Sequence, residues 1–311
     1  MNKEKNFVSA VVYVHNAEKK IQDFLNNLID VLEENFEHSE IICVNDCSDD
    51  NSADCIKELV QRTNNTTITI LNMSYYHGLE LAMNAGVDLS IGDFVFEFDS
   101  TLVDYEKDQI IKVYKRSLEG YDIVSASPDG KQKFTSRFFY YIFDKFANSR
   151  GKMYTERFRI LSRRVINRIS SMNKTVPYRK VLYANCGLKV DNLVYEVVAK
   201  VRDKQEKREK KYRRHLAVDT LILFTEMGYK FSITMTVAMM LVAVFMIVYS
   251  IATYLFSNPV EGWTTTILFL SAAFFGLFGI LTVIIRYLQI LVDLVFKRKR
   301  YSFESIEKLT K

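Results

Sequence analysis

Apolar and polar positions follow a repeating order through the first hundred residues of this chain. Residues 8–14 form a short β-branched apolar run, and residues 18–35 then carry apolar side chains at helical spacing. The same order recurs, which predicts strands at 40–45, 67–71 and 93–98 and helices at 52–63 and 78–90. Strands that alternate with helices build a parallel sheet covered by helices, and ligands of such sheets gather at the carboxyl ends of the strands.

The pattern is less regular after residue 98. Residues 131–150 interleave aromatic with basic side chains, which is typical of an interfacial amphipathic helix but equally of aromatics packed on the sheet. Further along, the pattern predicts a helix at 163–172, a short β segment near 188–201 and a basic helix that leads into 216–224.

Two uncharged runs follow, at 232–258 and 264–285, and each is long enough to cross a hydrocarbon core about 30 Å thick. Lysine and arginine are dense on both sides of this pair and absent between the two runs, which predicts cytosolic termini. No apolar h-region precedes the first strand, so we expect no signal peptide. The expected protein is a multi-pass protein of the cell membrane, with a cytosolic domain over 1–230, a two-helix transmembrane hairpin over 231–295 and a basic cytosolic tail over 296–311.

The net charge of +5 is concentrated at the predicted membrane boundary, so anionic lipid headgroups explain it more simply than nucleic acid. No nucleic-acid-binding motif is present, and we expect no nucleic acid partner. The four cysteines have the spacing of neither a zinc site nor a disulfide framework, and we interpret them as packing thiols in a reducing compartment.

Two strand-end segments carry a more specific pattern. Residues 11–18 read VVYVHNAE and residues 40–52 read EIICVNDCSDDNS, which resembles the paired openings VVxPxYNE and EIIxVDDGSxDxT of family 2 glycosyltransferases. Gly78, Gly86 and residues 92–99 continue the match in order and spacing. With two predicted spans behind the domain, the chain is most similar to polyprenyl-phosphate glycosyltransferases of the dolichol-phosphate mannose synthase and bactoprenol glucosyltransferase type.

The resemblance implies a GT-A fold, a Rossmann-like α/β nucleotide-sugar-binding domain followed by two transmembrane helices. It implies transfer of a hexose from a nucleotide diphosphate-sugar to a polyprenyl phosphate at the cytosolic face of the lipid bilayer, for cell-surface glycan synthesis. Mg²⁺ or Mn²⁺ is the implied cofactor. The sequence leaves open the sugar, the nucleotide, the polyprenol and whether copies of the chain assemble as a homo-oligomer.

The same resemblance assigns roles to individual residues. Asp99 and Thr101 are placed where the family holds its metal, Asp99 and Arg159 are the catalytic candidates, and Arg159 and Lys211 are the candidates for the lipid phosphate, since arginine can bind phosphate bidentately. The nucleotide-sugar-binding candidates are Tyr13, Asn16, Glu18, Asn45, Asp46, Gly78 and Asp99.

Other interpretations of these residues stay open. Carboxylates and hydroxyls between Asp46 and Ser52 are also good caps for the helix that follows. The chain departs from the family pattern at Asn45, Cys47, Thr101 and Arg157, and a hydroxyl at 101 is a weaker ligand that would shift coordination to Asp104 or water. Two hypotheses therefore stand: an active transferase, and a degenerate relative that keeps fold and anchor but acts as a binding or regulatory partner.

Overall fold

The computed structural model describes residues 3–130, 155–171, 178–198, 262–296 and 301–309, together with single positions between 215 and 245. The chain divides into two compact units. The first comprises residues 1–144, 149–216 and 299–311, and the second comprises residues 145–148 and 217–298. The predicted interfacial helix at 131–150 and Lys211 lie outside the described residues.

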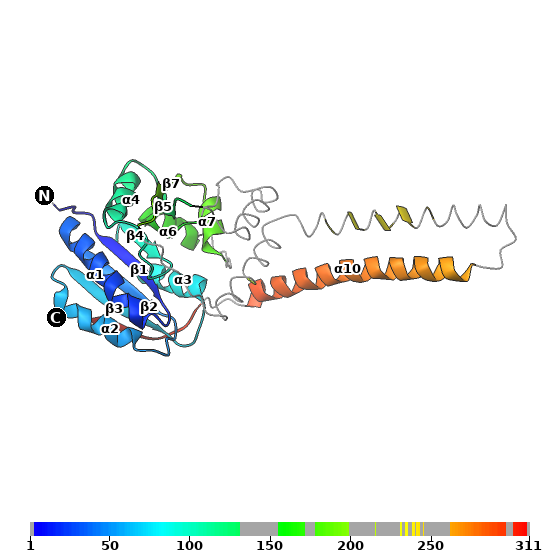
Figure 1. The fold of residues 1–311 in the computed structure, drawn as a ribbon, viewed down its shortest axis with the longest axis horizontal. Helices are drawn as coiled ribbons and strands as arrows, with labels where there is room; N and C mark the ends of the chain where they lie inside the picture. The colour runs from blue at the N-terminus through cyan, green and yellow to red at the C-terminus, as the bar shows by residue number, and fades with distance from the viewer. Residues whose placement is uncertain are drawn as a thin grey trace. The chain divides into compact units, whose positions relative to one another are not determined.

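The first unit is built on a mixed sheet of eight strands with the order β7-β5-β6-β4-β1-β2-β3-β8 (Figure 1). Strands β1 to β4 run parallel, whereas β6 is antiparallel to β4 and β5, and β8 is antiparallel to β3. The strands are β1 (Val8–Val14), β2 (Ser39–Asn45), β3 (Thr66–Met73), β4 (Phe94–Phe98), β5 (Ile123–Pro128), β6 (Phe158–Ser162), β7 (Val190–Tyr195) and β8 (Phe303–Leu309).

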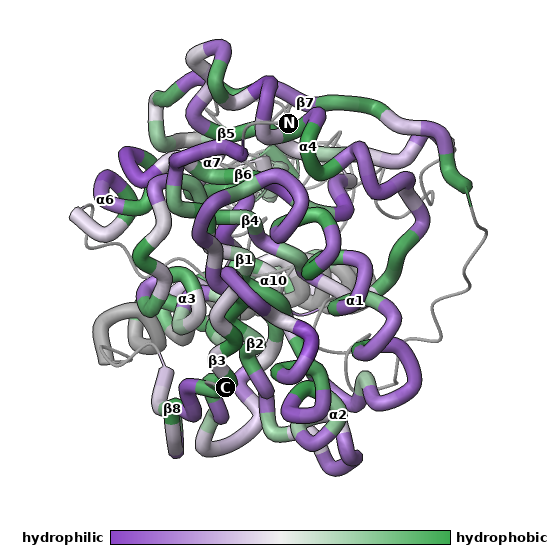
Figure 2. Tube along the Cα trace, turned by 90° about the vertical axis from the view of Figure 1, so that its left-hand side faces the viewer, coloured by the Kyte–Doolittle hydropathy of each residue, from purple (hydrophilic) through white to green (hydrophobic). Residues whose placement is uncertain are grey.

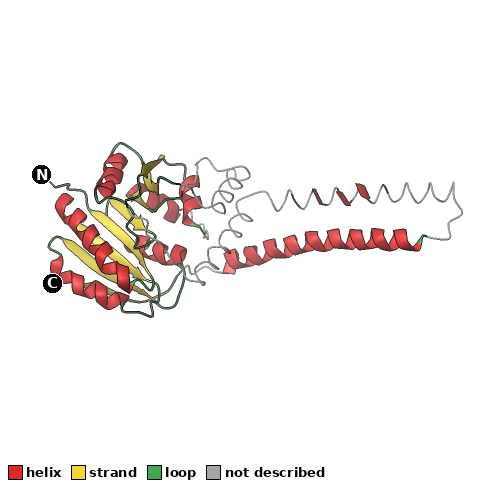
Figure 3. Ribbon diagram, viewed as in Figure 1, coloured by secondary structure: helices red, strands yellow, loops and turns green. Residues whose placement is uncertain are grey.

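Helices cover both faces of this sheet, which makes three layers (Figure 3). One face packs against α1 (Glu18–Asn35), α2 (Ser52–Glu58) and α4 (Asp108–Leu118), and α2 continues into a short 3-10 helix at Leu59–Arg62. The other face packs against α3 (Leu79–Leu89), α6 (Arg163–Ser171) and α7 (Arg179–Asn185).

Burial on both faces explains the composition of the central strands. All but one residue of β1 and of β2 are buried, and these strands appear as hydrophobic segments in Figure 2. A strand that is covered by helices on both sides needs a continuous apolar run rather than an alternating one. Helix α1 instead buries one stripe, because its apolar residues recur every three to four positions from Ile21 to Leu32.

The α/β prediction is confirmed, and the first four strands lie within two residues of their predicted bounds. The predicted parallel arrangement of these four strands is confirmed, and the sheet is extended by β6 and β8, which run antiparallel and were not predicted. Strand β8 was not predicted: residues 296–311 were interpreted as a basic tail, although polar and apolar residues alternate over 303–309 as they do in an edge strand.

In the second unit, α10 (Trp263–Phe296) contains the predicted span at 264–285. Met239 of the same unit packs against Gly276, and a Cβ at that position would lie 2.7 Å from its Sδ atom, so a larger residue there would displace the Met239 side chain. Among the residues that the structure describes, no helix combines the length and apolarity needed to cross a membrane.

Candidate functional site

The strand order reverses beside β1. The chain runs from β1 to β2 and β3 on one side and then crosses to β4 on the other side of β1. In an open α/β sheet, the crevice beyond the carboxyl ends of the strands at such a reversal is where ligands bind. Asn16, Asp46 and Asp99 follow β1, β2 and β4 at this edge, as the sequence predicts.

Asp46 is fully buried and ties three elements together. One carboxylate oxygen accepts a hydrogen bond from the His77 amide at 2.7 Å, and the other accepts from the Gly78 amide at 2.8 Å and from the Tyr13 hydroxyl at 3.0 Å. Gly78 has a φ of +84°, a conformation that glycine adopts without strain. The carboxylate therefore fixes the turn in front of α3, while the Asp46 carbonyl accepts from His15 Nδ1 at 2.8 Å.

The turns after β1 and β2 are joined side by side. The Asn16 side-chain oxygen accepts a hydrogen bond from the Asp49 backbone amide at 2.9 Å, and the Asn16 backbone amide donates to the Ser48 hydroxyl at 3.2 Å. The Glu18 amide donates to Asp50 at 3.0 Å. Asn16 and Cys47 both have φ near +50°, which asparagine tolerates better than most residues. The polar residues between Asp46 and Ser52 thus brace the start of α1, across the two turns, as well as the start of α2.

Asn45, the last residue of β2, completes this half of the edge. Its amide nitrogen donates to the Asn72 side-chain oxygen at 2.9 Å, and its oxygen accepts the Ser48 amide at 3.2 Å. The structure therefore brings together the nucleotide-sugar-binding candidates of the first three strands, which are Tyr13, Asn16, Glu18, Asn45, Asp46 and Gly78. We call this group the strand-end cluster.

Asp99 lies in a different setting, between two arginines. Its Oδ1 accepts from Arg179 Nη2 at 2.7 Å and its Oδ2 accepts from Arg159 Nη2 at 2.7 Å. Glu97, two residues earlier on the same face of β4, accepts from the same two guanidiniums at 2.6 and 2.7 Å and from the Tyr183 hydroxyl at 2.7 Å. Both arginines are only 1% exposed and Glu97 is 0% exposed, so the ion pairs to Glu97 are fully buried, whereas those to Asp99 are partly buried.

Two more carboxylates and a lysine extend the group. Glu80 of α3 accepts from the Arg179 side chain at 3.0 Å, and Glu156 lies 3.0 Å from Arg159 and 3.2 Å from Lys180. We call the whole set the arginine network; it contains one more carboxylate than cation. Its members are Glu80, Glu97, Asp99, Glu156, Arg159, Arg179 and Lys180.

The electrostatics of the network follow from burial and pairing. Burial alone would raise the pKa of Asp99, but the charges of Arg159, Arg179 and Lys180 outweigh it and hold that pKa well below its usual range. Burial opposes the charge on the two arginines, whereas the facing carboxylates raise the pKa of each guanidinium well above its usual value. Asp99 is therefore ionised and Arg159 and Arg179 are charged at any physiological pH.

The divalent metal implied by the resemblance does not fit these residues. A hard cation needs several free oxygen ligands, and both oxygens of Asp99 are already occupied by arginines. Asp104 is no substitute, because it accepts from the Tyr195 hydroxyl at 2.8 Å and from Arg157 at 3.0 Å. Within the described part of the chain, no three His, Cys, Asp or Glu side chains are grouped so that they could hold a metal ion.

Several members of the network were missed by the sequence analysis. Glu97 carried a usable signal, since a lone glutamate inside the apolar run of β4 is rarely buried without a partner. Arg179 carried none, because its contacts to β4 bridge about eighty residues of sequence. Arg157, one of the departures from the family pattern, pairs with Asp104 rather than entering the network, so its charge is balanced locally.

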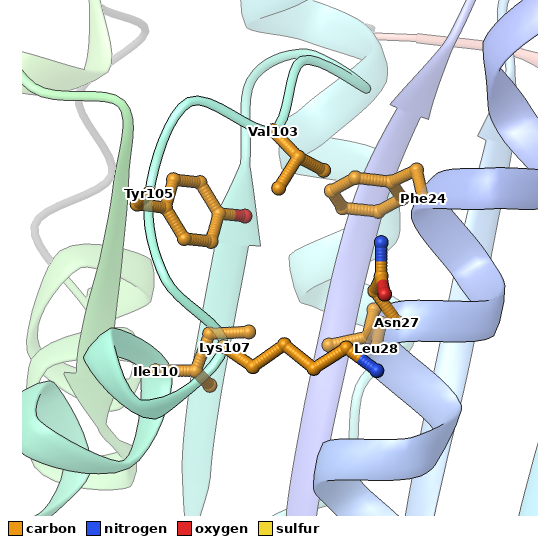
Figure 4. Close-up of a pocket in the computed structure, with 7 residues that line it drawn as sticks. All are labelled: Phe24, Asn27, Leu28, Val103, Tyr105, Lys107 and Ile110. Carbon is orange, nitrogen blue, oxygen red and sulfur yellow. The ribbon is translucent and has the colours of Figure 1, made fainter. Parts of the chain in front are cut away.

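A separate hollow lies between α1 and the segment that leads from β4 into α4 (Figure 4). Lys107 extends across it in the view, and its ammonium pairs with Asp30 at 2.9 Å. The lining is mainly apolar and includes none of the predicted site residues: Phe24, Asn27, Leu28, Val103, Tyr105, Lys107 and Ile110.

The mixed sheet, its covering helices and the reversal beside β1 define a GT-A-like α/β fold of the Rossmann type. Residues 9–173, more than half of the chain, match the model described as glycosyl transferase family 2, so the chain belongs to that family. The glucosyl-3-phosphoglycerate synthase of Mycobacterium tuberculosis, solved with phosphoglyceric acid, has a similar fold, with a TM-score of 0.50 at 14% identity over 70% of this chain and 79% of that one.

Three proteins with similar sequences are also named as transferases of sugars. An uncharacterised glycosyltransferase of Synechocystis is 30% identical over 61% of this chain and 60% of its own length. A prophage bactoprenol glucosyl transferase homolog of Escherichia coli is 28% identical over 60% of this chain and 62% of its length. The undecaprenyl-phosphate 4-deoxy-4-formamido-L-arabinose transferase of Proteus mirabilis is 32% identical over 41% of this chain and 38% of its length. The chain thus covers less than two thirds of each of these curated relatives.

Proposed function

We propose that this chain transfers a sugar from a nucleotide diphosphate-sugar to a polyprenyl phosphate at the cytosolic face of a membrane. The observation that carries the proposal is the strand-end cluster at the sheet reversal, in a chain that belongs to glycosyl transferase family 2. The acceptor class comes from two similar proteins, whose names state undecaprenyl phosphate and bactoprenol as what they act on.

In this proposal the residues of the strand-end cluster have different tasks. Asn45, Asn16 and Tyr13 hold the nucleotide, while Asp46 and Gly78 keep the turn before α3 in place. An amide such as that of Asn45 can both donate to and accept from a base edge. A phosphate oxygen of the acceptor attacks the anomeric carbon with inversion, and the nucleoside diphosphate leaves with the electron pair of the broken bond.

The arginine network lies beside the proposed reaction site. Asp99 is its most exposed carboxylate, with 16% of the side chain accessible against 0% for Glu97. Arg159 and Arg179 neutralise Asp99 and Glu97, so negative charge on β4 does not repel an anionic donor. Because Arg159 is 1% exposed, we assign Asp99 and Arg159 to the charge balance of the wall beside the donor diphosphate rather than to direct contact with a phosphate. Lys211 stays the candidate for the acceptor phosphate, and we derive no step that uses a metal ion.

The membrane anchor in this proposal rests on the sequence. The uncharged runs at 232–258 and 264–285 have the length of spanning helices, with basic segments on both flanks. A soluble anionic donor and a bilayer-bound acceptor meet only at the membrane surface, so an anchored domain serves the reaction.

One observation favours the second candidate, a protein that binds a nucleotide-sugar or a pathway enzyme without turnover. Both oxygens of Asp99, the residue at the family's metal position, are occupied by arginines. A transferase that lost its metal site in this way would keep the fold and the strand-end cluster.

The deciding experiment is transfer of radiolabelled sugar from UDP- and GDP-sugars to polyprenyl phosphate by the full-length chain in detergent micelles. We expect lipid-extractable product that falls strongly in Asn45→Ala. The control is Asn64→Ala, an exposed asparagine that precedes β3 at the opposite edge of the sheet and pairs with Glu33. Nucleotide binding without any lipid product would favour the second candidate, and loss of product in both variants would remove Asn45 from the site.

A further inference from the structure

The C-terminal strand β8 lies against the strand-end cluster although more than 200 residues of sequence separate them. It pairs antiparallel with β3 from Ile68 to Met73, and the Ser74 amide donates to the Ser302 carbonyl at 3.2 Å. The register shifts between Asn72 and Met73, and such an irregularity re-aims the side chains beside it. Two chains of hydrogen bonds lead from β8 to the cluster.

The first chain passes through His77. The Ser302 amide donates to His77 Nε2 at 3.1 Å, so this nitrogen is an acceptor and the ring proton is on Nδ1. Nδ1 in turn donates to the Tyr75 carbonyl at 2.5 Å, and the His77 amide donates to Asp46 at 2.7 Å. The His77 ring also stacks on Tyr75, with centroids 4.0 Å apart. Ser302, the residue before β8, thus holds the His77 ring, and the His77 backbone amide holds the Asp46 carboxylate.

The second chain passes through Asn72. Its side-chain nitrogen donates to the Ser305 hydroxyl at 3.0 Å and to Glu307 at 2.7 Å, both on β8. Its side-chain oxygen accepts from the Asn45 amide nitrogen at 2.9 Å. Because the Asn72 side-chain nitrogen is used by β8, its oxygen faces Asn45 and accepts from the Asn45 side-chain nitrogen. This fixes the orientation of the Asn45 side-chain amide, and therefore which of its atoms faces a ligand.

We propose that β8 is a working part of the donor site, in which His77 and Asn72 are positioning residues that transmit its docking to Asp46 and Asn45. The nucleotide-binding part of this inference rests on the proposed function. The two paths are independent, since one ends on the turn before α3 and the other on the last residue of β2. A strand added only to cover an exposed edge needs backbone pairing alone. Here Asn72 is directed at β8, and Ser74 and His77 are directed at Ser302, the residue before it.

The test compares variants that cut these paths with variants that loosen the same segment elsewhere. Asn72→Ala cuts the second path, and Ser302→Pro removes the amide that reaches His77. The matched controls are Ser302→Ala, which keeps that amide, and Tyr301→Phe, which removes the hydrogen bond of the same segment to Asp88 on α3 at 2.8 Å.

Two measurements are made on each full-length variant: the dissociation constants of UDP and GDP, and hydrogen exchange at the His77 and Gly78 amides. We expect the dissociation constant of the nucleotide that binds to rise about fivefold to tenfold in Asn72→Ala and Ser302→Pro, as the loss of one partly buried hydrogen bond on each path implies. Exchange at the two amides should quicken in Ser302→Pro and stay as in the unmodified chain in both controls.

Equal shifts in the controls would mean that β8 supports only the general stability of the edge, and would overturn the inference. Unchanged affinity and exchange in both path variants would overturn it as well. If the unmodified chain binds neither nucleotide, the proposed function fails; the exchange result alone then still decides whether β8 orders the turn that carries Asp46.

Discussion

Arg179 is the residue whose replacement tests the arginine network most directly. Its guanidinium spans three carboxylates, with Nε on Glu80 at 3.0 Å, Nη1 on Glu97 at 2.6 Å and Nη2 on Asp99 at 2.7 Å. Methionine has a similar length and no charge, so Arg179→Met removes the cation and leaves little empty space.

The expected cost follows from what stays behind. Glu97 is 0% exposed and the Glu80 side chain is 4% exposed, so these two carboxylates cannot be rehydrated when they lose Arg179, whereas Asp99 is 16% exposed and can gain some water. Removing one partner of a buried ion pair costs about 3–5 kcal/mol, because it leaves an uncompensated buried charge. Arg159 still faces Glu97 and Asp99, which places the expected loss in the free energy of unfolding toward the lower end of that range.

Cys43 provides a local readout of unfolding. It is fully buried in β2, and burial raises the pKa of its thiol to about 12, so it reacts only when the sheet opens. The full-length chain is incubated in increasing urea and given a short pulse of dithiodipyridine, and the modified fraction at Cys43 is read by mass spectrometry. Arg62→Met is the control, since Arg62 is exposed and its hydrogen bond to Asn26 is worth little.

Acidification gives the second arm of this prediction. The arginines hold the pKa of Asp99 below its usual range, so pairing of Asp99 contributes stability that is complete above the unfolded-state pKa of about 3.9 and is lost as pH falls below it. Arg179→Met has less of this contribution to lose, so the gap between the two proteins should narrow below about pH 4. A loss under about 1 kcal/mol at pH 7, or a gap that widens in acid, would refute the reasoning.

Three further outcomes are expected. Gly86→Ala should lower the free energy of unfolding by about 1–3 kcal/mol in the same urea assay, because its new Cβ would lie 2.6 Å from Val44 Cγ2, whereas Gly130→Ala, with open space around it, should not. Asp46→Asn should lower the free energy of unfolding by about 1–3 kcal/mol and weaken nucleotide binding measured by calorimetry, because the new side-chain nitrogen cannot accept a hydrogen bond from the His77 or Gly78 backbone amide. The dissociation constant of UDP should be the same with EDTA and with Mn²⁺, because the Asp99 oxygens are committed to arginines; a strong Mn²⁺ requirement would contradict this.

The first half of the fold could be predicted because local pattern and tertiary context agree there. Strand β1 and helix α1 have the predicted bounds, since a doubly covered strand reads as one apolar run and a half-covered helix as a periodic one. Strand β8 was missed because its partner strand β3 is more than 200 residues earlier, although its alternating residues do carry an edge-strand signal. No strand was predicted at 158–162 either, and the antiparallel direction of β6 is set by tertiary connections that carry no local signal.

The candidate site divides in the same way. The residues of the strand-end cluster were named from the resemblance to family 2 glycosyltransferases, and the structure brings them together at the sheet reversal. Only the general position, at the carboxyl ends of the strands, was predicted from the strand and helix pattern. The partners of those residues were not, because hydrogen bonds such as Asn72 to Glu307 join segments far apart in sequence. Asp99 was placed correctly at the end of β4, but its arginine partners come from β6 and α7, and a sequence motif does not specify which cation occupies a carboxylate.

The two halves of the site are therefore stabilised by different interactions, and substitutions in them should have different effects. In the strand-end cluster, amides and hydroxyls satisfy one another, so loss of one side chain removes a modest free energy and changes mainly what the edge presents to a ligand. In the arginine network, buried charges balance one another, so loss of one side chain leaves its partners as uncompensated buried charges and lowers the free energy of unfolding strongly. A variant of Asn45 that unfolds the protein, or a variant of Arg179 that changes only ligand binding, would contradict this division.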